Sequence, residues 1–218
     1  MIRNFTFTDG TQIPVGTMYC IGRNYSAHAR EMGAELPESA LVFIKPPTAF
    51  VPSHTSIRIP SISKNMHHEV EMVIIIGEDC SNIPASDALE HIAGYAVGID
   101  LTLRDVQTLA KQRGEPWAIA KGFDGSAPIS EAVPENEIEN PNNLLLELRV
   151  NGEVRQSGST KMMERTVEEL LEYVTSIFTL RRGDCIFTGT PEGVGRLESG
   201  DMVTAELQGV PILEISVI

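Results

Sequence analysis

The sequence has few cysteines, few aromatic residues and a shortage of positive charge. Its 218 residues include 3 cysteines, far apart as Cys20, Cys80 and Cys185, with no C-x-x-C pair. Dispersed cysteines in odd number indicate reduced thiols rather than a disulfide framework. Lys and Arg number 17 against 30 Asp and Glu, which gives a formal net charge of −13. Because phosphate backbones and anionic membrane surfaces repel such a chain, we expect no nucleic acid and no membrane as its partner.

Long apolar runs and known nucleotide motifs are absent as well. No apolar run approaches the ~20 residues that span a bilayer, and the opening "MIRNFTFTDG" lacks the apolar region of a signal peptide. The segment "GTPEGVG" lacks the Gly-Lys-Ser/Thr ending of a P-loop. We therefore expect a soluble, cytoplasmic protein. With 42% hydrophobic and 22% charged residues, the composition is that of a globular chain that forms about one domain.

Short strands dominate the pattern along the chain. Residues 1–15, with a turn at Asp9-Gly10, predict a small N-terminal β segment, while about 68–76 predict a stronger strand and 94–102 a further strand. Asn151-Gly152 indicates a type I′ hairpin turn. Helices are predicted near 26–33, over 103–114 and within 162–180. Because regular β-α-β alternation is missing, we expect a mainly β fold with short helices (α+β), rolled or sandwiched, rather than a doubly wound sheet.

Two glutamates stand directly before an apolar run in "NMHHEVEMVIIIG", residues 65–77. In a strand, Glu69 and Glu71 share one face, with their Cα atoms roughly 6.5–7 Å apart. Desolvation and mutual repulsion would favour protonation of at least one carboxyl group, unless a divalent cation binds both. The alternative is a solvated edge strand. His67 and His68 face opposite ways in a strand, and we expect them to pack or support rather than to bind a metal.

A third acid favours the metal over the solvated edge. Asp100 ends the apolar segment "AGYAVGID", where a lone buried carboxylate would be costly. Together with Glu69 and Glu71 it offers hard oxygen ligands, which suit Mg²⁺ or Mn²⁺. No cluster of Cys or His indicates zinc.

Several segments, taken in order, resemble the fumarylacetoacetate hydrolase family. They are "GRNYSAHAREMG", "VFIKPPTAF", "HHEVE", "GIDLTLRDVQ", "AKGFDGSAPI" and "TGTPEGVG", and the resemblance runs from about residue 16 to the C-terminus. The size favours the short acylpyruvase and oxaloacetate-processing branch. The resemblance implies one catalytic domain over residues 1–218, a mixed β-sandwich roll and a homodimer. It also implies one Mg²⁺ or Mn²⁺ bound by Glu69, Glu71 and Asp100.

The resemblance further implies roles for residues away from the carboxylates. His28 and Glu31, three apart on one face of a helix, match a water-activating pair on a lid, although a surface ion pair is the alternative. Lys121 matches a lysine that stabilises the enolate of the leaving group, and Gln107 would orient the attacking water.

Further candidates would bind the substrate carboxylate or support the site. These are Arg23, Lys45 and Thr190. For Tyr25 and Arg104, a structural role and a role in the site remain equally open.

The expected activity is hydrolysis of a carbon–carbon bond in a 3-acylpyruvate, a small α-keto acid that reacts as its enol, to pyruvate and a carboxylic acid. The same enolate chemistry would serve decarboxylation or tautomerisation of oxaloacetate. It would also serve isomerisation or decarboxylation of 2-hydroxyhepta-2,4-diene-1,7-dioate. The His28–Glu31 pair favours hydrolysis, because attack by water needs a base. A non-catalytic, metal-stabilised β binding protein is the alternative of another class, and it would need neither this pair nor Lys121.

Overall fold

The structure is a computed structural model, and it describes residues 3–31, 33 and 39–218. The predicted helix near 26–33 and the segment "GRNYSAHAREMG" therefore lie partly outside the described residues, because both include Met32. Residues 1–2 of the predicted N-terminal β segment lie outside them as well.

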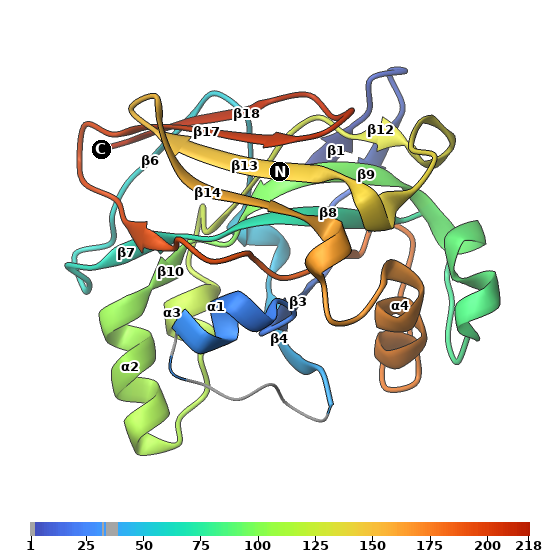
Figure 1. The fold of residues 1–218 in the computed structure, drawn as a ribbon, viewed down its shortest axis with the longest axis horizontal. Coiled ribbons are helices and arrows are strands. Elements are labelled where there is room, and N and C mark those ends of the chain that lie inside the picture. The colour runs from blue at the N-terminus through green and yellow to red at the C-terminus, as the bar shows by residue number, and fades with distance from the viewer. Residues whose placement is uncertain (1–2, 32, 34–38) are drawn as a thin grey trace.

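Two sheets build most of the fold (Figure 1). The strands of the larger, mixed sheet are β3 (Met18–Gly22), β4 (Leu41–Lys45), β5 (Phe50–Pro52), β8 (Val70–Ile76), β9 (Ile92–Ile99), β11 (Ala127–Ile129), β12 (Val133–Pro134) and β15 (Cys185–Phe187). Their order is β4-β3-β15-β8-β9-β11-β5, with β12 paired to β9. The second sheet has the order β14 (Glu153–Ser159), β13 (Leu145–Val150), β17 (Met202–Leu207), β18 (Leu213–Val217) and β6 (Thr55–Ile57).

Smaller elements complete the described chain. Short strands pair as β10 (Thr102–Leu103), β7 (Met66–His68) and β16 (Gly195–Arg196), and as β1 (Asn4–Thr6) with β2 (Gln12–Pro14). The α-helices are α1 (Ser26–Glu31), α2 (Arg104–Arg113), α3 (Ala118–Lys121) and α4 (Val167–Thr175). The 3₁₀ helices are η1 (Pro47–Ala49), η2 (Ala85–His91), η3 (Glu135–Glu137), η4 (Pro141–Asn143) and η5 (Thr160–Met162). The predicted mixed α+β fold, mostly strands with short helices, is confirmed.

Strand β8 is buried on both faces, which explains the unbroken apolar run that the sequence shows. Val70, Met72, Ile74 and Ile76 belong to the core cluster that also contains the inner side chains of the second sheet. Val73 and Ile75 point the other way, into the concave side of the larger sheet. Because side chains alternate along a strand, Glu71 lies on this concave side as well.

Small residues on β9 let the concave side close. Gly98 pairs with Glu71 across the ladder. A Cβ atom on Gly98 would lie 2.7 Å from Cγ2 of Val73 and 2.8 Å from Cε1 of Phe187. The missing side chain therefore allows Phe187 to fill the space directly behind the carboxylates.

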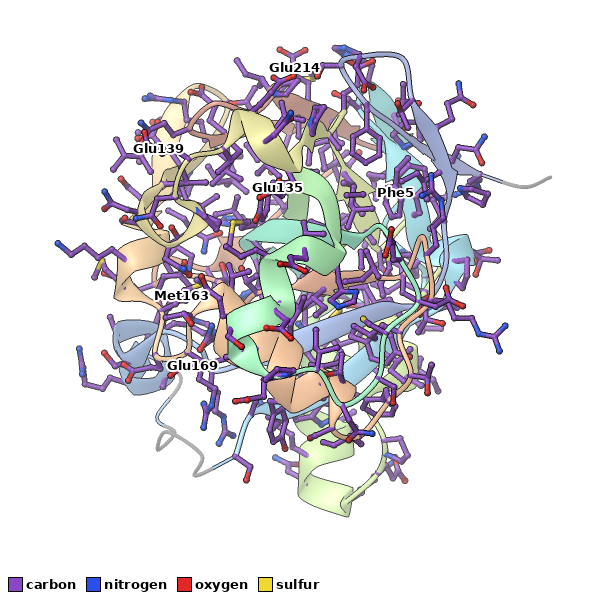
Figure 2. The ribbon with its side chains drawn as sticks, turned by 90° about the vertical axis from the view of Figure 1, so that its right-hand side faces the viewer. Phe5, Glu135, Glu139, Met163, Glu169 and Glu214 are labelled. Atoms are coloured by element: carbon purple, nitrogen blue, oxygen red, sulfur yellow. The ribbon has the colours of Figure 1, made fainter. Side chains whose placement is uncertain are left out.

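The hairpin of β1 and β2 covers the far part of the concave side. Phe5, Phe7 and Ile13 are buried there, and the ring of Phe5 meets that of Phe50 edge to face, 5.4 Å between centroids. Figure 2 shows Phe5 turned into the interior, while acidic side chains such as Glu139 and Glu169 lie at the outside. The excess negative charge is thus spread over the surface.

The predicted turn at Asn151-Gly152 and the predicted helix end at Gly114 are both confirmed. Asn151 and Gly152 both have positive φ, 53° and 83°, as a type I′ turn requires. Helix α2 ends at Gly114, whose left-handed conformation caps it. The helix predicted within 162–180 is shorter, because Thr166 caps α4 through its side chain. The short helix α3 was not predicted.

The three cysteines are free and buried, and burial raises the pKa of each thiol. Among the described residues, no helix has the length and apolar character needed to cross a membrane.

Candidate metal centre and active site

Three carboxylates meet where β8 and β9 begin and end. Glu69 lies between β7 and β8, Glu71 lies in β8, and Asp100 follows β9. The antiparallel pairing of β8 with β9 brings them together, and the amide N–H of Asp100 donates to the carbonyl oxygen of Glu69 at 2.8 Å. One oxygen from each carboxylate lies within 4.8 Å of the others, and the three residues are 5%, 2% and 1% exposed. The predicted grouping of these three acids is confirmed.

Buried cations surround two of the three carboxylates. Lys121 Nζ lies 2.8 Å from Glu69 Oε2 and 2.6 Å from Asp100 Oδ2. Arg104 forms an ion pair with the other oxygen of Glu69. Lys45 Nζ lies 2.8 Å from Asp100 Oδ1. Of the possible roles for Arg104, the structure thus favours one inside the site.

Glu71 differs from its two neighbours because no cation among the described residues pairs with it directly. Burial, together with the charges of Asp100 and Glu69, raises its pKa well above the ordinary range. Burial also acts to raise the pKa of Glu69, but Lys121 and Arg104 outweigh burial and hold that pKa well below the ordinary range. Burial acts to lower the pKa of Lys121, and Asp100 and Glu69 overcome this and raise it.

The donor set fits a divalent cation. Three buried carboxylates offer oxygen atoms only, which matches the preference of Mg²⁺ and Mn²⁺. A cation between them would remove the repulsion that raises the pKa of Glu71. In the described residues, the charge of Lys121 and the backbone N–H of Gly189, 2.6 Å from Glu71 Oε2, only partly offset that repulsion.

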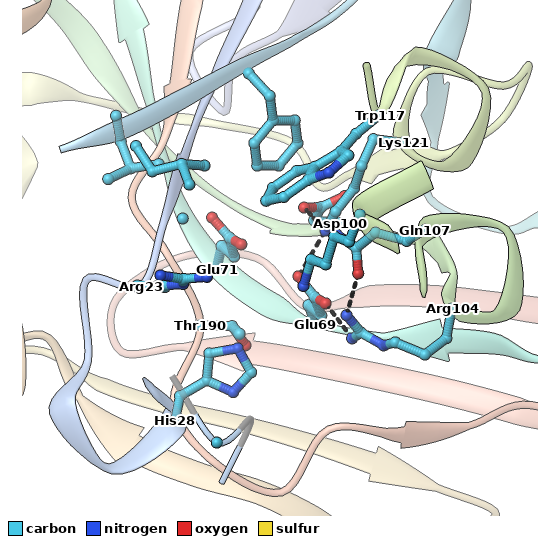
Figure 3. A pocket seen from close by; sticks show the side chains of 16 residues that line it. Arg23, His28, Glu69, Glu71, Asp100, Arg104, Gln107, Trp117, Lys121 and Thr190 are labelled. Carbon is cyan, nitrogen blue, oxygen red and sulfur yellow. Dashed lines mark hydrogen bonds and ion pairs between the residues drawn. The ribbon is translucent and has the colours of Figure 1, made fainter. Parts of the chain in front are cut away.

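A cavity of about 220 Å³ opens onto the carboxylates. Figure 3 shows Glu69, Asp100 and Lys121 grouped together, Glu71 beside Arg23, and His28 near Thr190. The described residues that line it are Ile21, Gly22, Arg23, His28, Gly33, Leu41, Phe43, Glu69, Glu71, Asp100, Arg104, Gln107, Lys111, Trp117, Lys121 and Thr190.

Helix α1 carries the predicted histidine–glutamate pair. His28 Nδ1 lies 3.2 Å from Glu31 Oε2, and the side chain of His28 is only 9% exposed. Glu31 also accepts hydrogen bonds from the backbone N–H of Gly193, at 3.1 and 3.2 Å. The glycine-rich loop that carries no nucleotide motif thus holds the helix over the cavity. His28 is among the lining residues, so the pair is more than a surface ion pair.

Hydrogen bonds fix how two polar side chains face the cavity. Arg104 Nη1 donates to Gln107 Oε1 at 2.7 Å, which leaves the amide N–H₂ group of Gln107 free to donate. Thr190 Oγ1 accepts from Gln156 Nε2 at 2.7 Å, so its own hydroxyl hydrogen is available to another acceptor. Both side chains can therefore donate toward a bound oxygen.

Lys45 does not lie where it could contact a substrate in the cavity. It is fully buried, 0% exposed, and is not among the described residues that line the cavity. Its ammonium group also donates to the carbonyl oxygen of Ser126 at 3.0 Å and pairs with Asp100 from behind. Of the two predicted roles, this position favours support of the site over contact with substrate. Arg23, which does line the cavity, adopts a left-handed backbone conformation with φ of 61°.

The two histidines beside the glutamates lie outside the cavity lining. His68 is buried, with Nδ1 2.9 Å from Gln156 Oε1, and His67 Nε2 lies 3.0 Å from Asn65 Oδ1. Sequence reasoning missed Gln156, and it also missed Lys111 and the aromatic residues Phe43 and Trp117. The contacts of Gln156 with His68 and of Phe43 with Trp117 join segments far apart in the sequence, and no local pattern marks Lys111.

Gln156 is expected to be a stability determinant of this region. Its Oε1 accepts from the N–H of Val70 at 3.1 Å, and its Nε2 donates to the carbonyl oxygen of Pro191 at 2.9 Å. Gln156→Leu would leave these buried groups unpaired, so we expect a loss of about 3 kcal/mol in the free energy of unfolding. Urea denaturation measures it, with the exposed Gln112→Leu as control. Equal stability of the two variants would contradict this role.

Fold and site together define a mixed α+β protein whose curled sheet carries a buried, all-carboxylate metal site. Residues 17–218 match the family described as "Fumarylacetoacetate (FAA) hydrolase C-terminal". The chain belongs to the fumarylacetoacetate hydrolase family, in the short branch of the relatives described next.

Relatives of similar length match nearly the whole chain. The mitochondrial oxaloacetate tautomerase of Arabidopsis thaliana is 43% identical over 211 residues, covering 97% of this chain and 92% of the relative. Its counterpart in Bos taurus is 41% identical, and the match covers 91% of this chain and 90% of that relative. The crystal structure of fumarylpyruvate hydrolase from Pseudomonas aeruginosa in complex with Mn²⁺ and pyruvate is 39% identical, with a TM-score of 0.96, covering 100% of this chain and 96% of that one.

Proposed function

We propose that this protein is a divalent-metal-dependent enzyme that hydrolyses 3-acylpyruvates to pyruvate and a carboxylic acid. The observation that carries the proposal is the layout of one cavity. Glu69, Glu71, Asp100 and Lys121 line it together with His28, whose Nδ1 lies 3.2 Å from Glu31 Oε2. An electron sink and a base thus face the same small space.

We propose that Glu69, Glu71 and Asp100 hold Mg²⁺ or Mn²⁺. When bound there, the ion supplies Lewis-acid stabilisation for the negative charge of an enolate. The fit of the three buried oxygen donors supports this assignment. The similar hydrolase of Pseudomonas aeruginosa, which binds Mn²⁺ and pyruvate, supports it independently.

His28 is the proposed base. Glu31 accepts a hydrogen bond from Nδ1, which fixes the imidazole tautomer and leaves Nε2 to take a proton from water. Hydroxide then adds to the distal carbonyl carbon of the substrate. As that carbonyl re-forms, the carbon–carbon bond breaks and its electron pair passes to the pyruvate carbon. Protonated His28 can return the proton to this carbon, which completes pyruvate.

The remaining polar side chains position the substrate. Lys121, kept charged by Asp100 and Glu69, stabilises the enolate oxygen. Gln107 donates from its free amide group to the attacking water, and Thr190 donates to the substrate carboxylate. Arg23 provides a further cation at the cavity wall. We propose that Lys45 holds Asp100 in place from behind.

Tautomerisation of oxaloacetate is the second candidate. It is supported by the oxaloacetate tautomerases of Arabidopsis thaliana and Bos taurus, at 43% and 41% identity. The same site could catalyse this reaction. His28 would move a proton between the substrate's carbon and its enol oxygen, directly or through water, and no hydroxide would add to the substrate. Oxaloacetate and the fumarylpyruvate named for the similar hydrolase both carry a second carboxylate.

A substrate panel distinguishes these activities. Purified protein is incubated with acetylpyruvate, fumarylpyruvate, oxaloacetate and 2-hydroxyhepta-2,4-diene-1,7-dioate, with Mg²⁺, with Mn²⁺ or with EDTA. We expect loss of enol absorbance with release of pyruvate from the acylpyruvates, and no turnover in EDTA. Enol–keto conversion of oxaloacetate without acylpyruvate cleavage would select the tautomerase. Absence of any turnover with metal would rule out both candidates.

The family resemblance also supports a homodimer in which residues 1–218 form one catalytic domain. Size-exclusion chromatography with light scattering tests the dimer, and a mass equal to the 23.8 kDa of one chain would exclude it.

A further inference from the structure

Helix α2 presents a row of side chains to the cavity. Arg104, Gln107 and Lys111 are spaced i, i+3 and i+7, which places them on one face of a helix. All three line the cavity. Arg104 and Gln107 lie deep, partly or largely buried, whereas Lys111 is exposed at the mouth. The row therefore runs from the carboxylates outward along the path that a substrate would occupy.

Lys111 lies against an aromatic ring, and no acidic residue of the described chain pairs with it. Its ammonium nitrogen lies 5.0 Å from the centre of the Trp117 ring, a cation–π distance. Trp117 in turn lies 5.9 Å from Phe43, whose ring is 4.9 Å from the ammonium group of Lys121. Within residues 3–31, 33 and 39–218, no carboxylate lies within ion-pair distance of Lys111, whereas Lys121 and Arg104 each pair with Glu69.

Among the described residues that line the cavity, positive side chains outnumber carboxylates. Within residues 3–31, 33 and 39–218, four cationic side chains and three carboxylates line it, in a chain whose formal net charge is −13. Partial burial of its ammonium group in the cavity mouth lowers the pKa of Lys111, and repulsion by Arg104, Arg23 and Lys121 adds to the effect. A divalent cation at the carboxylates would increase the positive excess. A bound anion beside Lys111 would relieve this repulsion.

We propose that Lys111 binds a carboxylate at the distal end of the substrate, so that the protein selects 2-oxo acids carrying a second carboxylate. The inference rests on the proposed function, because the orientation of the substrate, with its 2-oxo acid end at Glu69, Glu71 and Asp100, comes from it. Lys111 acts on specificity alone. The ring of Trp117 holds the ammonium group over the cavity, which lowers the entropy lost when it meets the anion.

Fumarylpyruvate and acetylpyruvate form a matched pair for the test. They share the 2,4-dioxo acid end and differ in the substituent on the distal carbonyl, which is a trans-CH=CH–COO⁻ group in fumarylpyruvate and a methyl group in acetylpyruvate. For Lys111→Gln, we expect the ratio of kcat/KM for fumarylpyruvate over acetylpyruvate to fall about tenfold, the loss typical of one hydrogen bond to a charged group. The change should lie in KM for fumarylpyruvate. Lys111→Arg, which keeps the charge, should retain most of the preference.

Arg113→Gln is the matched control. It removes one positive charge from the same helix, at a side chain that is 64% exposed and is not among the described lining residues. In this variant, the ratio of kcat/KM for fumarylpyruvate over acetylpyruvate should stay within about twofold of the ratio in the unaltered protein. If Lys111→Gln and Arg113→Gln change the ratio equally, or if Lys111→Gln leaves it unchanged, the proposal is overturned.

A binding measurement separates this inference from the proposed function. Calorimetry with Mn²⁺ present compares pyruvate with 2-oxoglutarate, which adds a distal carboxylate, so no turnover is needed. Lys111→Gln should weaken the binding of 2-oxoglutarate about tenfold more than the binding of pyruvate. Equal effects on the two acids would overturn the role of Lys111 even if every substrate is turned over. The expected difference would support it even if the substrate panel rejects hydrolysis.

Discussion

Glu71→Gln is expected to abolish binding of Mg²⁺ and Mn²⁺ and to lower turnover by on the order of 10³-fold. The substitution removes one of the three buried carboxylates but keeps nearly the same shape. A glutamine Oε1 can still accept the hydrogen bond that Gly189 N–H gives to Glu71 at 2.6 Å. The loss would therefore reflect charge and coordination rather than collapse of the site. Calorimetric titration with Mn²⁺ and steady-state kinetics measure the two effects.

Thermal unfolding supplies an internal check on this prediction. Without metal, Glu71→Gln should be at least as stable as the unaltered protein, because it removes a buried carboxyl group whose pKa Asp100 and Glu69 raise together with burial. Added Mn²⁺ should raise the melting temperature of the unaltered protein and not that of the variant. The exposed Glu90→Gln serves as control. Equal stabilisation of Glu71→Gln by Mn²⁺ would contradict its role as a ligand.

His28→Ala is expected to lower acylpyruvate hydrolysis by roughly 10²–10⁴-fold while leaving Mn²⁺ affinity in place. The imidazole lines the cavity and is oriented by Glu31, but it lies outside the carboxylate cluster. Removing it should therefore remove the base without disturbing the metal ligands. The rate of pyruvate release and the Mn²⁺ affinity, measured on the same preparation, test the two halves of the prediction.

Two further variants on α1 sharpen the assignment. Glu31→Gln should lower the rate less than His28→Ala does, because the glutamate only orients the imidazole and fixes its tautomer. Arg30→Gln, exposed on the same helix, should leave the rate within about twofold. Unchanged hydrolysis in His28→Ala would exclude this histidine as the base and leave the carboxylate cluster unaffected as a metal site.

The local sequence predicts those features of this protein that depend only on the alternation of side chains along a strand and on which residues are apolar. The alternation of Glu69 and Glu71 predicts two carboxylates on the same side of the chain. In the structure Glu69 lies in the one-residue gap between β7 and β8, Glu71 lies in β8, and their carboxylate oxygens lie within 4.8 Å of each other. The apolar run after Glu71 predicts a strand buried on both faces, which β8 is. The apolar run before Asp100 likewise predicts a buried strand, and Asp100 stands at its end. Asn151-Gly152 and Gly114 mark a turn and a helix end through their own backbone preferences.

Contacts between distant segments could not be predicted in this way, because pairing depends on how the sheets curl. The position of Lys45 behind Asp100 depends on the approach of β4 to residues 100–126. The support that Gly189 gives to Glu71 depends on a loop more than 100 residues further along the chain.

The sequence by itself therefore determined a mainly β chain with three acids at the ends of buried strands. It did so because strand period and the cost of burying charge are local properties. Only the tertiary structure decided which charges meet. It paired Glu69 with Lys121 and Arg104, left Glu71 without an ion pair among the described residues, and set Lys111 against Trp117 at the cavity mouth. The physical reason is that electrostatic energy depends on distances and burial that arise when β8, β9 and α2 pack together.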